Sequence, residues 1–91
     1  MKNLTLQNFR EILSLHDNAI SVDDWNDDKL LEAHLGTDLE LDSLDIIDMI
    51  AEFEIEYGVL IDNLLFDNKM YPSASDADVR TFLKVCNECL K

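Results

Sequence analysis

The segment from Asp42 to Gly58 constrains the fold most strongly, because its apolar residues follow the repeat of an α-helix. Several of them share one face of such a helix: Ile46, Met49, Ile50, Phe53 and Tyr57. Asp42, with Asp45 three residues later, resembles a capping box, and Gly58 is typical of the residue that ends a helix. We therefore predict a central helix with one buried face.

Ser43 stands directly after the Asp42 cap, among acids and with no basic side chain nearby in the sequence. If Asp42 caps the helix, the Ser43 hydroxyl stays free at the first helical position, where another protein can modify it. Alternatively, Ser43 is itself the N-cap. No His or Lys lies beside Ser43 to act as a base, so we do not expect it to be an autonomous nucleophile.

A second stripe on the same helix is apolar but falls outside the core face. It comprises Leu44, Ile47 and Ala51, together with Asp48. The acids that flank it are Asp45, Glu52 and Glu56. Apolar residues outside the core face and surrounded by acids predict a partner-binding face.

The charge of the chain excludes several kinds of partner. Twenty acids against seven Lys and Arg give a net charge of −13, and no Lys or Arg lies between Leu30 and Asn68. This charge repels phosphate backbones and anionic lipid heads, so we expect neither nucleic acid nor a membrane surface as partner. It attracts basic protein surfaces instead.

The composition favours an all-α fold. The chain has 91 residues, of which 47% are apolar, and this suits one small domain spanning residues 1–91. Two glycines and one proline are too few for the many tight turns of an all-β domain.

Apolar spacing predicts a first helix that starts at Asn3 or Thr5 and ends at Leu15. Its buried stripe is Leu6, Phe9, Ile12 and Leu13. We expect His16 to Thr37 to form a loop with a short helical turn from about Asp28 to His34. The apolar anchors of this loop are Ile20, Val22, Trp25, Leu30, Leu31 and Leu35.

Two further helices are expected in the C-terminal third. The apolar segment from Val59 to Phe66 predicts a short helix, followed by a loop from Asn68 to Ser75 that contains Pro72. The buried stripe of the final helix is Val79, Phe82, Leu83, Cys86 and Leu90. Two pairs of residues before it have the spacing of a cap: Ser73 with Asp76, and Ser75 with Asp78.

No pattern in the sequence points to a metal site or to catalysis. The acidic cluster that begins near Asp24 fails as an EF-hand, because Lys29 and Leu35 stand where that loop needs glycine and glutamate. No combination of nucleophile, base and orienting group is visible, so we do not expect an enzyme.

The cysteines, the histidines and the N-terminal segment carry weaker signals. Cys86 and Cys89 have the spacing of a redox pair, and the alternative is a core cysteine with a partly exposed neighbour. His16 and His34 are expected at the surface. Without the apolar run of a signal peptide or a membrane span, the chain is expected to be cytoplasmic.

The motif Asp42-Ser43-Leu44-Asp45, at the start of an acidic amphipathic helix in a chain of this length, resembles the acyl carrier protein family. The resemblance covers nearly the whole chain and implies a small four-helix bundle, in which three helices are the main ones and the third along the chain is short. It implies that a phosphopantetheinyl transferase, with magnesium, attaches 4′-phosphopantetheine from coenzyme A to Ser43. The thiol of this arm then holds acyl groups as thioesters.

The resemblance also implies roles for other residues. A face that binds partners would comprise Asp42, Leu44, Asp45, Ile47, Asp48, Ala51 and Ile61. The cavity that receives the acyl chain would be lined by Ile46, Ile50 and Phe53. The partners would be acyl-transfer and chain-elongation enzymes with basic docking surfaces, in fatty-acid, polyketide or related synthesis, and the carrier would be a monomer.

The chain departs from the family at several positions. Glu40 and Leu41 stand where members often have glycine and a small residue or methionine, and a glycine occurs instead at Gly36. Ile55 replaces a usual acid. These departures favour a specialised, free-standing carrier. The alternative is an unmodified acidic module, an adaptor or inhibitor that docks through the central helix and has no need of Ser43.

Overall fold

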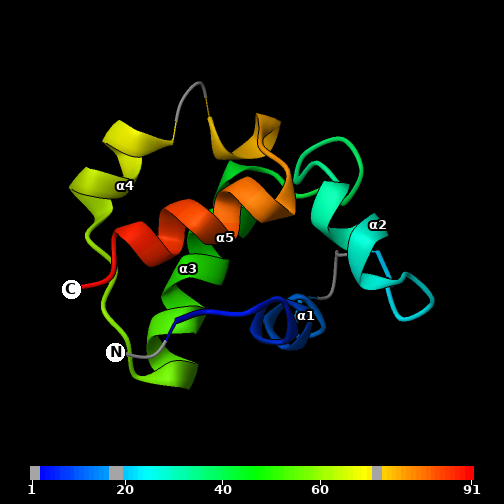
Figure 1. Cartoon of the computed structure of the whole chain (residues 1–91), viewed down its shortest axis with the longest axis horizontal. Coiled ribbons are helices and arrows are strands. Elements are labelled where there is room, and N and C mark those ends of the chain that lie inside the picture. Colours follow the sequence, from blue (N-terminus) through cyan, green and yellow to red (C-terminus); the bar gives the residue numbers. More distant parts are fainter. Residues whose placement is uncertain (1–2, 17–19, 71–72) are drawn as a thin grey trace.

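Helices form almost all of the regular structure. The computed structural model describes residues 3–16, 20–70 and 73–91. These residues form five α-helices and one 3-10 turn (Figure 1): α1 Leu6–Leu13, α2 Asp27–Glu32, α3 Ser43–Tyr57, α4 Asn63–Lys69, η1 Ala74–Asp76 and α5 Val79–Glu88. The predicted all-α class is therefore confirmed.

Side-chain caps decide where the helices begin. Thr5 and Asn8 form a capping box at α1, so of the two predicted starts Thr5 is the cap. The final helix begins later than either predicted pair, because Asp78 accepts a hydrogen bond from the Thr81 backbone N–H at 2.8 Å. The remaining caps are Asn26 for α2, Asp42 for α3 and Asp62 for α4.

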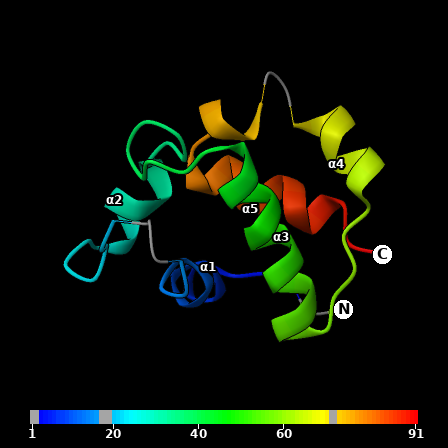
Figure 2. The same ribbon diagram turned by 180° about the vertical axis from the view of Figure 1, so that it is seen from behind.

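The core is built around Phe82 of α5. Its ring centroid lies 6.1 Å from that of Phe9 in α1, 6.3 Å from that of Phe53 in α3 and 6.0 Å from that of Phe66 in α4. Figures 1 and 2 show α5 crossing α3, with α1 and α4 on different sides of this crossing. One aromatic side chain thus contacts three other helices.

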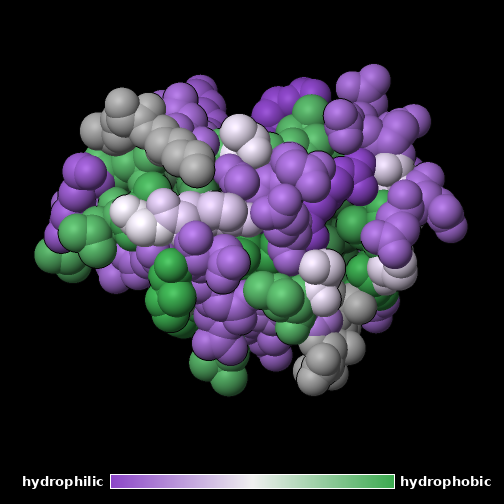
Figure 3. Space-filling model, turned by 90° about the horizontal axis from the view of Figure 1, so that it is seen from below, coloured by the Kyte–Doolittle hydropathy of each residue, from purple (hydrophilic) through white to green (hydrophobic). Residues whose placement is uncertain are grey.

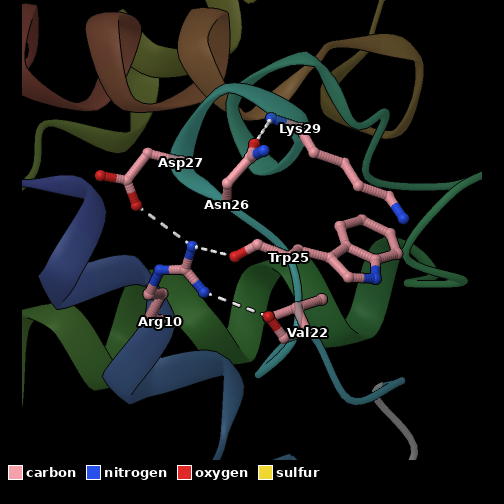
Figure 4. Close-up of polar contacts among 6 residues, drawn as sticks. All are labelled: Arg10, Val22, Trp25, Asn26, Asp27 and Lys29. Atoms are coloured by element: carbon pink, nitrogen blue, oxygen red, sulfur yellow. Dashed lines mark hydrogen bonds and ion pairs between the residues drawn. The ribbon is translucent and has the colours of Figure 1, made fainter.

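Arg10 of α1 holds the loop that precedes α2 (Figure 4). Its guanidinium donates to the Val22 carbonyl at 3.1 Å and to the Trp25 carbonyl at 2.7 Å, and pairs with Asp27 at 3.1 Å. Trp25 is half-buried against the core, with Lys29 Nζ 4.3 Å from its ring centroid. Trp25 is therefore an anchor of the loop, as predicted, and Arg10 is the polar anchor that the apolar pattern did not reveal.

A short antiparallel pairing joins the segment before α3 to the segment before α5. Gly36 N–H donates to the Ser75 carbonyl at 2.9 Å, and Leu35 N–H donates to the Ala77 carbonyl at 3.0 Å. A side chain at Gly36 would place its Cβ 2.8 Å from the Ser75 carbonyl oxygen. Only glycine allows this approach, which brings η1 next to the start of α3.

Several predicted boundaries are wrong. The first helix ends at Leu13 rather than Leu15. The short helix predicted from Val59 is α4, which begins only at Asn63, because Asp62 has an extended backbone and is the cap. It continues to Lys69, into the segment predicted as a loop, and the last two residues of that segment, Ala74 and Ser75, belong to η1. Pro72 lies outside the described residues.

Two predictions about single side chains are also wrong. Cys89 is buried with 1% exposure, rather than partly exposed. The side chain of His16 is only 11% exposed, and its Nε2 lies 3.4 Å from Glu52 Oε2 on α3. The expected surface position is correct for His34, whose side chain is 52% exposed.

Candidate functional site

Ser43 lies at the exposed N-terminus of α3 with its hydroxyl free. Asp42 Oδ1 accepts from the Asp45 N–H at 2.8 Å, and Asp45 Oδ2 accepts from the Asp42 N–H at 3.1 Å. This reciprocal box confirms the predicted cap, so the alternative in which Ser43 caps the helix is wrong. Within the described residues, no hydrogen bond engages the Ser43 hydroxyl.

The approach to Ser43 has an unusual backbone. Leu39 and Leu41 are both buried, and the Leu41 N–H donates to the Leu35 carbonyl at 2.9 Å. Glu40 between them is exposed and has a φ of 58°, in the left-handed region that favours glycine. Glu40 therefore has a backbone conformation that favours glycine although it carries a full side chain.

A cavity of about 530 Å³ opens between α3, α4 and η1, and Ser43 is one of its lining residues. Its apolar wall includes Ile46 and Ile50 of α3 and Phe66 of α4. Phe53, which was predicted in this lining, packs in the core against Phe82 instead. The free Ser43 hydroxyl and a cavity with an apolar wall are thus next to each other.

The outward face of α3 is apolar along its whole length. Leu44 is 71% exposed and Ile47 is 60% exposed, and Ala51 continues this stripe. Ile55, one further helical repeat along, is 81% exposed and extends it to the end of the helix. Its i+4 spacing from Ala51 was the signal in the sequence. Figure 3, which shows the molecule from below, has several hydrophobic patches between the hydrophilic residues of that face.

The structure separates two of the other predicted residues from this face. Ile61 is buried with 3% exposure, and its N–H donates to Glu54 Oε2 at 2.9 Å, so its side chain does not lie on the predicted partner-binding face. Glu52 faces His16. Asp48 and Glu56 are exposed along the stripe.

The buried cysteines do not suit redox chemistry. Burial raises the pKa of the Cys86 thiol strongly, and burial likewise raises the pKa of Cys89. Reactive cysteines have the opposite property, a lowered pKa that favours the thiolate. Among the described residues, no group of His, Cys, Asp and Glu side chains has an arrangement that could hold a metal ion.

Comparisons with protein-family models, curated proteins and solved structures found no match to this chain. Among the described helices, none is both long and apolar enough to cross a bilayer. The case for a function therefore depends on the chemistry and placement of the residues around Ser43.

Proposed function

We propose that the chain is an acyl carrier, folded as an acyl-carrier-like bundle, that bears 4′-phosphopantetheine on Ser43. The observation that carries this proposal is the exposed Ser43 hydroxyl, left free by the capping box, beside a cavity with an apolar wall. A serine that served only to begin the helix would be the cap, and here Asp42 has that role.

The attachment chemistry suits a serine that lacks a base of its own. A bond forms between Ser43 Oγ and the phosphorus of the phosphopantetheinyl group of coenzyme A, and adenosine 3′,5′-bisphosphate leaves. The proton of the hydroxyl passes to a base on the transferase. The positive end of the α3 dipole favours the phosphodiester, whereas Asp42 and Asp45 oppose it.

The cavity supplies a place for the cargo. Its volume of about 530 Å³ is within the ~300–1,000 Å³ of small-molecule sites. Each methylene group that moves from water onto apolar side chains such as Ile46, Ile50 and Phe66 stabilises the inserted acyl chain by about 0.8 kcal/mol. An apolar acyl chain on the arm therefore has a reason to enter the cavity between enzyme visits.

The partner enzymes would dock on the outward face of α3. Its apolar stripe gives contact area, and the exposed acids Asp48 and Glu56 beside it favour a basic surface on the partner. This docking would bring Ser43, at the beginning of the same helix, to the partner's active site. Ile55 in place of an acid favours specialised rather than housekeeping partners.

The exposed stripe from Leu44 to Ile55 also favours the second candidate, an unmodified adaptor or inhibitor that docks through α3. That function has no need of a free serine hydroxyl or of the adjoining cavity. Incubation with coenzyme A, magnesium and a phosphopantetheinyl transferase separates the two candidates. The carrier gains the mass of one phosphopantetheinyl group, and Ser43→Ala does not. An unchanged mass would favour the adaptor.

A further inference from the structure

Two other serines border the cavity that Ser43 borders, and their hydroxyls form a chain of hydrogen bonds. Ser73 and Ser75, on either side of the first residue of η1, have their Oγ atoms 3.1 Å apart. Ser73 Oγ also donates to Asp76 Oδ2 at 3.1 Å. Both serines are half-buried.

The direction of this chain follows from proton counting. A carboxylate only accepts, and a hydroxyl has one proton to donate. Ser73 gives its proton to Asp76, so in the contact with Ser75 it can only accept, and Ser75 must be the donor. The lone pairs of Ser75 Oγ are then the unused acceptors of this hydrogen-bond chain, and a donor from a ligand can bind to them.

The backbone holds this acceptor in place. The Ser75 carbonyl accepts from the Gly36 N–H at 2.9 Å, and the Ala77 carbonyl accepts from the Leu35 N–H at 3.0 Å. Gly36 and Leu35 belong to the segment that leads into α3. The position of Ser75 is therefore held by hydrogen bonds of the backbone to the segment that leads into α3, and not by its side chain alone.

We propose that Ser75 Oγ binds an amide N–H of the arm attached to Ser43, with Ser73 and Asp76 as positioning residues. This inference rests on the proposed function and names the residue that would hold the arm against the cavity wall. The arm contains two secondary amides, and an amide N–H that leaves water for this cavity is destabilised unless it meets an acceptor. Ser75 is an acceptor at that cavity, and its own proton is already used.

Hydrogen exchange of the arm tests the proposal. The protein is loaded with ¹⁵N-labelled phosphopantetheine, and the exchange rates of the two arm amides are measured by NMR. One amide should exchange about 2- to 10-fold more slowly in the wild type than in Ser75→Ala, the range expected for one hydrogen bond. Ser75→Thr, which keeps the hydroxyl, should retain the slow exchange, and so should Ser21→Ala, a control outside this cavity.

Each remaining outcome is decisive. If the arm is attached to Ser43 but both amides exchange equally fast in the wild type and in Ser75→Ala, the inference is wrong while the proposed function stands. If no arm is added to Ser43 at all, both are wrong. If Ser21→Ala accelerates exchange as much as Ser75→Ala does, the protection does not come from the serine pair, and the inference is again wrong.

Discussion

Replacing Glu40 with glycine should stabilise the protein, although it removes a side chain and adds no contact. Glu40 has a φ of 58°, and a left-handed backbone costs a residue with a Cβ about 1–2 kcal/mol. Glycine avoids that cost but loses about 0.5–1 kcal/mol because it is more flexible in the unfolded chain. The difference predicts that Glu40→Gly is about 0.5–1 kcal/mol more stable than Glu40→Ala.

The comparison with Glu40→Ala isolates the backbone, because both variants remove the same charge and the exposed side chain. For a domain of this size the gain corresponds to a rise of about 2–8 °C in the midpoint of thermal unfolding. A matched pair at Glu56, exposed in α3, should give the opposite sign, with glycine about 1 kcal/mol less stable than alanine. If Glu40→Gly is no more stable than Glu40→Ala, the strain assigned to this position does not exist.

Three further predictions concern packing, charge and pH. Gly36→Ala should destabilise the fold by about 1–3 kcal/mol in urea unfolding, because the added Cβ would lie 2.8 Å from the Ser75 carbonyl oxygen. An unchanged urea midpoint would contradict this contact. Raising salt from low to moderate concentration should raise the unfolding midpoint, because it screens repulsion within a chain of net charge −13; a midpoint that does not move would refute this. Burial, and then the hydrogen bond to Glu11, raises the pKa of Tyr57 to about 12. The folded state therefore holds the phenol proton more tightly than the unfolded state does. This contribution to the stability of the fold is lost as the pH rises from about 10 to about 12. Ultraviolet absorbance in a Tyr71→Phe background should show this titration, and Glu11→Gln should lower its midpoint; a midpoint near 10 in the parent would be the contrary result.

Local features of the sequence predicted the parts of the site that depend on neighbouring residues. Asp42 and Asp45 form the expected capping box, Gly58 ends α3 with a φ of 65°, and Leu44 and Ile47 lie on the outward face. Each of these follows from residues within one or two turns of a helix. The resemblance to acyl carrier proteins singled out Glu40 as a departure from their pattern, but it did not predict the left-handed backbone of Glu40.

Features that depend on distant contacts could not be predicted in this way. From the resemblance, Ile61 was assigned to the partner-binding face and Phe53 to the acyl cavity. In the structure Ile61 pairs with Leu90 and Phe53 packs against Phe82, two residues far along the chain. His16 reaches α3 only after the chain has folded, so its sequence neighbours contain no sign of Glu52.

The serine pair on η1 was missed for a related reason. Ser73 and Ser75 were considered only as caps of the final helix, and Asp78 took that role. Their position at the cavity follows from the pairing of Gly36 with Ser75, across 39 residues of sequence. Neither composition nor residue spacing predicts a backbone pairing between segments so far apart in the sequence.

The most direct test of the central claim is to locate the modification by fragment mass spectrometry. After reaction with coenzyme A, magnesium and a phosphopantetheinyl transferase, the account predicts one phosphopantetheinyl group per chain, carried only by the peptide that contains Ser43. Serines such as Ser14, Ser21, Ser73 and Ser75 serve as internal controls in the same digest. A group on any of these, or an unmodified Ser43 after complete reaction of a known carrier in parallel, would contradict it.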